Sequence, residues 1–215
     1  GMLELLGDIL DLVRIESGHV SLSPRRANLR ELVESVVRVF EGLARQKNLI
    51  MKLDIDASVG CDVLVDPVRF QQVLSNLLGN AIKFTDSGEV RILLRVEQIV
   101  DERLQVILRV EDTGIGIDAQ DLQHLFQPFS QANHGAASRG GTGLGLVISR
   151  SLCELMGGSL QICRAIGQGT TLEASFLFNK LSAVPLSPPQ REQGLGAARA
   201  LKVLVVDDQP ANRLL

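Results

Sequence analysis

The sequence predicts an α/β protein, because stretches with helical and with strand-like spacing of apolar residues alternate along most of the chain. Helical spacing recurs in four stretches, residues 3–16, 29–43, 70–84 and 143–156. Alternating or β-branched runs predict strands over residues 49–55, 63–65, 89–98, 104–111, 159–164 and 170–178. With 215 residues, 45% of them hydrophobic, the chain is long enough for one substantial core plus appendages.

The first helical stretch carries an apolar seam. Leu3, Leu6, Leu10 and Val13 are spaced three, four and three residues apart, as in a coiled coil. An isolated amphipathic helix of this length is marginal in water, so we expect it to pack on a partner helix in a dimer or bundle. Docking on its own domain is the alternative. Ser17-Gly18 ends the helix.

Local signals mark the ends of the next helices. Asn28 with Glu31 forms a capping-box-like start, and Asp66-Pro67 opens a central helix with proline at its first position. Gly157-Gly158 stops the last helix. The apolar face of the central helix consists of Phe70, Val73, Leu74, Leu77, Ala81 and Phe84.

Composition excludes several classes of protein. A net charge of -3 and the absence of Trp and Tyr argue against nucleic acid as a partner. The three cysteines are widely spaced and odd in number, which favours reduced thiols in a cytosolic setting. No apolar run approaches ~20 residues and no signal-peptide pattern is present, so we expect a cytoplasmic chain.

The central helix also carries a polar face. Asn76, Asn80 and Lys83 lie at i, i+4 and i+7 and therefore project from one side of the helix. Amide oxygens are hard ligands suited to Mg²⁺, and a lysine offers positive charge to a phosphate. A solvated helix face is the plain alternative.

Asp112 ends a strand of aliphatic residues and begins the segment Asp112-Thr113-Gly114-Ile115-Gly116. A buried carboxylate is costly unless it meets a donor, and the exocyclic amine of adenine is such a donor. The glycines Gly114 and Gly116 let the backbone approach a base closely. The alternative is a simple Asp-Thr-Gly turn.

Gly141, Gly143 and Gly145 alternate with Thr142 and Leu144 where the last helix begins. Exposed main-chain N–H groups at a helix N-terminus attract phosphate. No Gly-Lys-Ser/Thr follows, as a Walker A loop requires, and the spacing differs from a dinucleotide-binding fingerprint. A flexible loop closing onto a helix is the alternative.

Residues 126–142 are predicted to form a long loop and a lid over a ligand. Phe126 and Phe129 flank Pro128, and we expect at least one of these rings to anchor the loop in the core. Arg139 could reach a phosphate from the loop or could be solvated.

Taken together and in this order, the motifs in residues 66–178 resemble those of the GHKL ATP-binding fold, specifically the catalytic domain of a sensor histidine kinase. They look like the N box (Asn76, Asn80, Lys83), the G1 box (Asp112, Gly114, Gly116), the F box (Phe126, Phe129) and the G2 box (Gly141, Gly143, Gly145). The resemblance implies a two-layer α/β sandwich with a mixed sheet, and ATP and Mg²⁺ as cofactors. It also implies that Asn80 coordinates Mg²⁺ with help from Asn76, that Asp112 reads adenine, and that Thr171 supports Asp112 through water.

The flanks also show resemblances. Residues 1–18 are similar to the end of the second helix of a dimerisation and phosphotransfer domain, followed by the catalytic domain at 19–180. Residues 181–200, rich in Pro, Ser, Gln, Gly and Ala, predict a linker. Residues 201–215 resemble the first strand of a receiver domain, with Asp207 and Asp208 as its acidic metal-binding pair.

These flanks imply a hybrid sensor kinase of a bacterial two-component system. Its dimerisation domain, which bears the substrate histidine, and its receiver domain are the expected partners. The longer protein is expected to be a homodimer anchored in the inner membrane by other segments. This chain alone is expected to be a monomer or a weak dimer.

His19, His124 and His134 do not match a phosphoacceptor motif. The leading hypothesis is therefore a kinase domain that binds Mg-ATP and donates the γ-phosphoryl group to a histidine outside this chain. An ATP-hydrolysing clamp is a second hypothesis, but the gyrase, chaperone and mismatch-repair branches of the fold carry Glu, a general base, where Asn76 stands. A non-catalytic nucleotide-binding interaction module is the third.

Overall fold

The computed structural model describes residues 2–18, 20–57, 59–60, 62–100, 103–130, 142–164 and 169–181. The chain divides into two compact units, Gly1–Ser182 and Ala183–Leu215, and all described residues belong to the first. The expected receiver strand at 201–215, and the expected linker beyond Leu181, lie outside the described residues.

One mixed sheet forms the first layer of the domain. Its strands follow the order β1-β3-β7-β5-β4-β2, and β6 also pairs with β7. Strands β2 and β4 run parallel, whereas the other described pairings are antiparallel. The bounds are β1 Arg25–Asn28, β2 Ile50–Ile55, β3 Asp62–Val65, β4 Glu89–Val100, β5 Arg103–Asp112, β6 Ser159–Arg164 and β7 Thr171–Lys180.

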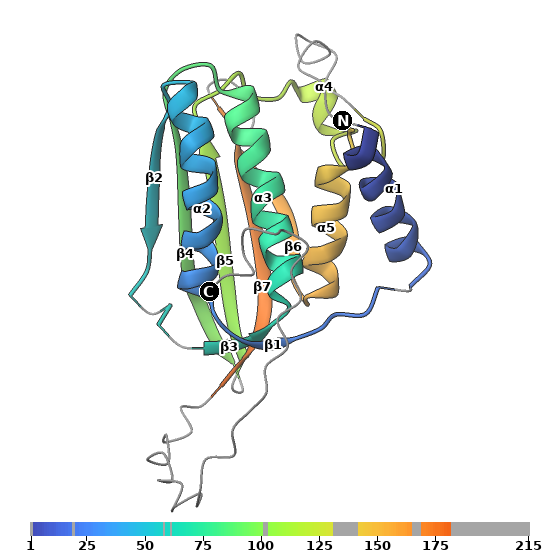
Figure 1. Ribbon diagram of the computed structural model, residues 1–215, viewed down its shortest axis with the longest axis vertical. Coiled ribbons are helices and arrows are strands. Elements are labelled where there is room, and N and C mark those ends of the chain that lie inside the picture. The colour runs from blue at the N-terminus through green and yellow to red at the C-terminus, as the bar shows by residue number, and fades with distance from the viewer. Residues whose placement is uncertain are drawn as a thin grey trace, which may run out of the picture. The chain divides into compact units, whose positions relative to one another are not determined.

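Helices form the second layer. Figure 1 shows α2 (Leu29–Gln46), α3 (Pro67–Phe84) and α5 (Gly145–Leu155) side by side on one face of the sheet, with α3 between the other two. Helix α1 (Met2–Glu16) packs against α5, and α4 (Ala119–Leu122) is a single turn. The expected two-layer α/β sandwich with a mixed sheet is confirmed. In the described part of the chain, no helix combines the length and apolarity needed to cross a membrane.

The helix starts form as the sequence predicts. The Asn28 side-chain oxygen accepts a hydrogen bond of 3.3 Å from the N–H of Glu31 at the start of α2. At the start of α3, Asp66 Oδ1 accepts from the N–H groups of Val68 and Arg69, both at 3.1 Å, with Pro67 at the first helical position. These side chains satisfy donors that a helix N-terminus leaves unpaired.

The core lies between α3 and the sheet. The ring of Phe70 on α3 lies 5.1 Å from that of Phe176 and 6.1 Å from that of Phe178, both on β7. The predicted apolar face of α3 is buried at Phe70, Val73, Leu74, Leu77 and Ala81, whereas Phe84 is half-buried at the end of the helix. This packing fixes which side of α3 remains for polar residues.

Two elements were not predicted. Strand β1 has the sequence Arg-Arg-Ala-Asn, without an apolar alternation, and it forms because it pairs antiparallel with β3. The short α4 turn follows an uncapped Asp118 and has no apolar period of its own. Pairing with a distant strand is a non-local effect that a local pattern does not contain.

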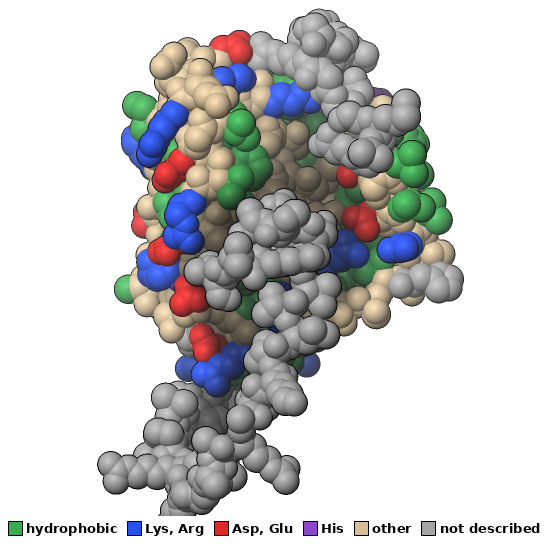
Figure 2. Space-filling view, in the orientation of Figure 1, with side chains coloured by type: hydrophobic (Ala, Val, Ile, Leu, Met, Phe, Trp, Pro, Cys, Tyr) green, Lys and Arg blue, Asp and Glu red, His purple; other side chains and the backbone are tan. Residues whose placement is uncertain are grey.

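Helix α1 docks on its own domain, which was the alternative to a partner helix. Leu12 is buried there, but Leu5, Leu6, Ile9, Leu10 and Val13 are exposed. Figure 2 shows hydrophobic side chains gathered at the edge of the molecule where Figure 1 places α1. The predicted partner helix for this seam stays a prediction.

Replacing the fully buried Phe70 by alanine is expected to lower the free energy of unfolding by about 3–5 kcal/mol, because it removes ring contacts and leaves a cavity. Denaturant unfolding measures this change. Val68→Ala, on the same helix at a side chain that is 61% exposed, is the control and is expected to change stability little. Equal effects of the two substitutions would contradict the assigned core.

Candidate functional site

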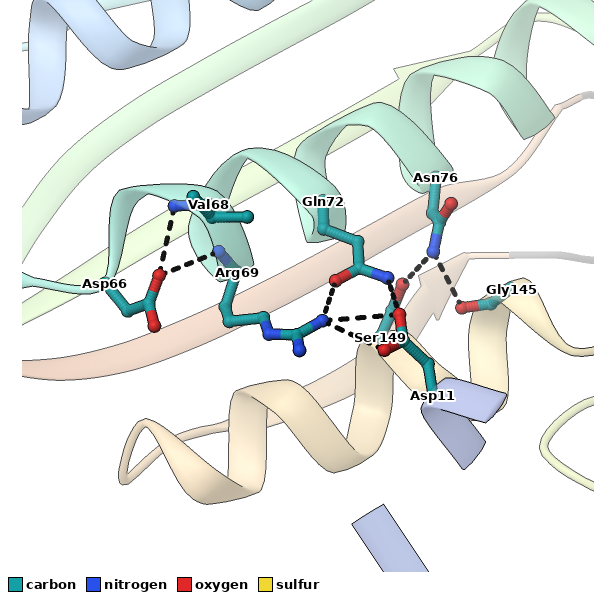
Figure 3. Close-up of polar contacts among 8 residues, drawn as sticks. All are labelled: Asp11, Asp66, Val68, Arg69, Gln72, Asn76, Gly145 and Ser149. Carbon is teal, nitrogen blue, oxygen red and sulfur yellow. Dashed lines mark hydrogen bonds and ion pairs between the residues drawn. The ribbon is translucent and has the colours of Figure 1, made fainter. Parts of the chain in front are cut away.

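Asn76 and Asn80 lie one turn apart on the half-buried polar face of α3. The Asn76 side-chain nitrogen donates to the carbonyl oxygen of Gly145 and to Ser149 Oγ, both at 3.2 Å (Figure 3). A carbonyl oxygen only accepts, so the amide nitrogen must face α5. The Asn76 Oδ1 therefore points away from Gly145, where it is able to accept or to coordinate.

Asn80 lies on the next turn of α3 and is half-buried. Among the described residues, none forms a hydrogen bond with its side chain. Since partly buried polar groups normally find partners, this amide is well suited to a ligand.

Lys83 lies in the last turn of α3, and its Nζ is 4.7 Å from the centre of the neighbouring Phe84 ring. Its ammonium group therefore lies over an aromatic face, an attractive arrangement. A phosphate contact would require the flexible side chain to reorient.

Asp112 ends β5 with only 7% of its surface exposed. Its Oδ1 accepts from the N–H of Gly114 at 2.8 Å and from the N–H of Thr170 at 3.2 Å. Burial raises the pKa of this carboxyl above its ordinary value, while the main-chain donors and the positive charge of Arg164 counteract part of that rise. Both main-chain donors use Oδ1, so Oδ2 remains able to accept a hydrogen bond from a ligand.

Glycine is required where the backbone crowds this carboxylate. A Cβ added at Gly114 would lie 2.4 Å from the carbonyl oxygen of Phe84 and 2.9 Å from Asp112 Oδ1. A Cβ at Gly169, whose φ is +80°, would lie 1.9 Å from the carbonyl oxygen of Asp112. The Gly169 N–H also donates to the carbonyl oxygen of Gly114 at 2.9 Å. Gly169 therefore belongs to the site, although its sequence context indicated only a turn between two strands.

Thr170 is the threonine that contacts Asp112 directly, and the expected water-mediated support from Thr171 stays a prediction. The Thr170 N–H donates to Asp112 Oδ1 at 3.2 Å, and the carbonyl oxygen of Thr170 accepts from the N–H of Asp112 at 2.9 Å. Thr171 is buried and pairs with Glu111 in the β5–β7 register. Neighbouring residues of a strand face opposite sides of the sheet, so a shift of one residue decides which threonine reaches the carboxylate.

The second glycine segment leads into α5. Gly143 has a φ of +71°, and a Cβ there would lie 2.8 Å from the carbonyl oxygen of Ser130. Helix α5 begins at Gly145, and the side chain of its N-cap residue, Leu144, makes no capping hydrogen bond. A helix N-terminus without such a cap attracts anions through its first N–H groups. Leu144 is fully buried, whereas Gly141 and Arg139 lie outside the described residues.

The two phenylalanines of the loop segment differ in environment. Phe126 is half-buried and packs against the core, with the Arg150 guanidinium of α5 at 5.2 Å from the centre of its ring. Phe129 is 60% exposed and has a φ of +63°. Phe126 is thus the ring that anchors the start of the loop, as expected for at least one of the two.

Gly116 and His124 lie at the margin of these segments. Gly116 adopts a φ of +74°, and the exposed His124 ring lies 3.0 Å from the side-chain oxygen of Gln127. His19 and His134 lie outside the described residues.

Helix α1 contributes two acidic residues that the sequence reading missed. Asp11 accepts from Arg69 Nη1 at 3.2 Å and from Gln72 Nε2 at 2.8 Å, and Figure 3 shows this cluster one turn from Asn76. Asp8 accepts a hydrogen bond of 2.8 Å from the Thr142 hydroxyl at the second glycine segment. Both contacts join residues more than 50 positions apart, so local spacing gave no signal.

A metal ion at this site would be held by amide, water and phosphate oxygens, and not by a cluster of carboxylates. In the part of the chain that the structure describes, no group of three His, Cys, Asp or Glu side chains could hold a metal. The Asn76 and Asn80 amides suit an ion such as Mg²⁺, which takes most of its ligands from water and phosphate. The donor set therefore fits a metal that arrives with its phosphate ligand.

The sequence is similar to one known family and to bacterial sensor proteins. Residues 65–180 match the family model described as "Histidine kinase-, DNA gyrase B-, and HSP90-like ATPase". The whole chain aligns at 46% identity with 18% of the virulence sensor protein BvgS of Bordetella bronchiseptica. It aligns at 34% identity with 18% of the sensor protein EvgS of Escherichia coli K12.

Solved structures show the same fold. Full-length ShkA, in complex with AMPPNP, superimposes with a TM-score of 0.73 at 28% identity over 85% of this chain and 37% of that one. The catalytic domain of the histidine kinase ThkA gives a TM-score of 0.58 at 26% identity over 73% of this chain and 98% of that one.

The chain spans about a fifth of the length of the curated relatives it matches, 18% in the case of BvgS and of EvgS. The family match covers the strands and helices that hold Asn76, Asp112 and Gly145. The chain therefore belongs to the histidine kinase-, DNA gyrase B- and HSP90-like ATPase family, and its described domain is an ATP-binding domain of the sensor histidine kinase type.

Proposed function

We propose that this domain binds Mg-ATP between α3, α5 and the Asp112 segment and donates the γ-phosphoryl group to a histidine outside this chain. The observation that carries the proposal is the buried Asp112 carboxylate, flanked by Gly114 and Gly169 where a side chain would clash. A carboxylate with a raised pKa at a close-packed backbone edge is typical of a functional site.

Asp112 is proposed to select adenine. An ionised carboxylate only accepts hydrogen bonds, so it pairs with the exocyclic amine of adenine and disfavours the carbonyl that guanine presents there. Glycine at position 114 lets the main chain pack directly against this carboxylate, where a Cβ would clash. Thr170 supports the carboxylate through its N–H.

The phosphates are proposed to lie between α3 and α5. Asn80 and the Oδ1 of Asn76 would hold a magnesium ion, which supplies neutralisation of phosphate charge when bound. The N–H groups at the start of α5 would donate hydrogen bonds to a phosphate oxygen. Lys83, Arg139 and Gly141 remain candidates for further phosphate contacts.

Transfer is favoured over hydrolysis by the chemistry of Asn76. An amide cannot remove a proton from water, and the nitrogen of this one is held by Gly145 and Ser149. The relatives named as sensor proteins, and the similar solved domain of the histidine kinase ThkA, support a histidine as the acceptor. We infer a weak basal ATPase rather than a hydrolytic clamp.

The surrounding architecture is likewise proposed. Residues 1–18 would end the second helix of a dimerisation and phosphotransfer domain, 181–200 would form a linker, and 201–215 would begin a receiver domain. The exposed seam of α1 supports a partner helix there. We propose that the longer protein is a homodimer anchored in the inner membrane.

The wild-type chain is expected to bind Mg-ATP more tightly than Mg-GTP, and more tightly than ATP without metal. Asn80→Ala is expected to lose the magnesium-dependent part of this affinity, about tenfold or more, without unfolding, because no described residue forms a hydrogen bond with the Asn80 side chain. Calorimetry with and without magnesium measures the change. Asn179→Ala at the exposed end of β7 is the control, and an Asn80→Ala affinity equal to that control would refute the assignment.

Asp112→Asn is expected to weaken Mg-ATP binding by about tenfold or more and to reduce the preference for ATP over GTP, because it replaces a charged acceptor by an amide. Asp54→Asn on β2, the same substitution at an exposed aspartate, is the control. A variant as selective as wild type would contradict adenine recognition by Asp112.

The protonation of Asp112 makes both the stability of the domain and its ATP affinity depend on pH. Its raised pKa means that the folded state binds the proton more tightly, so its contribution to stability falls as the pH rises through the folded pKa. Asp112→Asn is therefore expected to leave the unfolding midpoint at neutral pH unchanged or higher. Wild-type ATP affinity should fall on acidification at a pH above the ordinary range for aspartate, and a loss confined to that ordinary range would contradict the raised pKa.

A further inference from the structure

The last turn of α3 is capped by three separate parts of the chain. Helix ends leave carbonyl groups without intrahelical donors, and glycine often terminates the helix. Here the helix is followed by Thr85 in an extended conformation. The Thr85 hydroxyl donates to the carbonyl oxygen of Ala81 at 2.7 Å, and the N–H of Ile115 donates to that of Phe84 at 3.3 Å.

Lys47, at the C-terminal end of α2, binds three further carbonyl groups at this end of α3. Its Nζ donates to the carbonyl oxygen of Ile82 at 2.8 Å and to those of Lys83 and Thr85 at 3.2 Å each. An ammonium group has three donors, and all three are used here. Its positive charge also matches the negative end of the α3 dipole. Lys47 itself follows α2 as its C-terminal cap residue.

These carbonyls surround the point where α3 meets the Asp112 segment. Lys47 binds the carbonyls immediately before and after that of Phe84. The Phe84 carbonyl oxygen in turn accepts from the N–H of Ile115 and lies 2.4 Å from the position that a Cβ of Gly114 would take. The same turn of α3 follows directly on Asn80. Lys47 thus holds the end of α3, the stretch of backbone that follows Asn80 and contacts the segment after Asp112.

We propose that Lys47 is a positioning residue for the nucleotide. By holding the last turn of α3 through three carbonyl groups, it fixes the distance and orientation between Asn80 and Asp112, and so between the metal-phosphate end and the base end of the ligand. Lys47 touches neither end itself. The inference rests on the proposed binding of Mg-ATP.

The test uses the full chain with Lys47→Met, which keeps a long side chain but removes the donors, and Lys47→Gln, which keeps two. Arg45→Met is the matched control, because Arg45 is a basic residue of the same helix end and pairs only with Glu41 among the described residues. Two quantities are measured at a temperature where each variant is folded. They are the affinity for Mg-ATP and the hydrogen exchange rate of the Ile115 amide, with the Glu31 amide at the other end of α2 as internal reference.

Lys47→Met is expected to weaken Mg-ATP binding by about ten- to a hundredfold, the scale of a small displacement of binding groups, and to accelerate exchange at Ile115. Lys47→Gln should show smaller effects of the same sign, and it decides the question if Lys47→Met does not fold. Arg45→Met should change neither quantity.

Folded Lys47 variants with wild-type affinity and altered thermal stability alone would overturn the proposal, since Lys47 would then be merely structural. Wild-type exchange at Ile115 would overturn it as well. If the wild-type chain itself does not bind Mg-ATP, the proposed function fails and the inference fails with it. The wild-type titration therefore distinguishes the two failures.

Discussion

Helix α3 has to bury one face against the sheet while a second face stays polar, and the site depends on this division. The ring of Phe70 packs against Phe176 and Phe178 on β7, which fixes the rotation of the helix about its own axis. That rotation directs Asn76 toward α5 and places Asn80 on the same side one turn later. A helix held less firmly could not keep two amides at a fixed position, because each is a small group with a short reach.

Burial of the Asp112 carboxylate costs free energy that the contacts within the protein do not fully offset. Asp112 is buried, and its raised pKa shows that the folded protein disfavours its charge. The N–H groups of Gly114 and Thr170 compensate only in part. A ligand donor at Oδ2 would complete the compensation, so the binding energy of the base and the stability of the empty domain are opposed at this residue. The same crowding explains why positions 114 and 169 are glycines. A Cβ added at Gly114 or at Gly169 would lie within 3 Å of an atom of Asp112.

Local patterns predicted much of this molecule. The capping residues Asn28 and Asp66 and the apolar face of α3 could be read from spacing, because helix starts and helix faces depend on residues within a few positions of one another. The order of the polar and glycine motifs indicated the family, which the family model confirms.

Features set by distant pairing could not be read in this way. Strand β1 exists only through β3, and the choice between Thr170 and Thr171 depends on the β5–β7 register. The contacts of Asp8 and Asp11 on α1, and those of Lys47 on α3, join segments that only the tertiary fold brings together. Lys47 in particular looks like an ordinary solvated charge at a helix end until its three carbonyl partners are known.

In the proposed complex, Asp112 reads adenine while Asn80 serves the metal and phosphates. A crystal structure of the chain grown with Mg²⁺ and a non-hydrolysable ATP analogue would show both contacts. We expect the exocyclic amine of adenine within hydrogen-bonding distance of Asp112 Oδ2, and a magnesium ion coordinated by Asn80 beside the start of α5. A nucleotide bound with its base away from Asp112, or a metal held without Asn80, would contradict this arrangement.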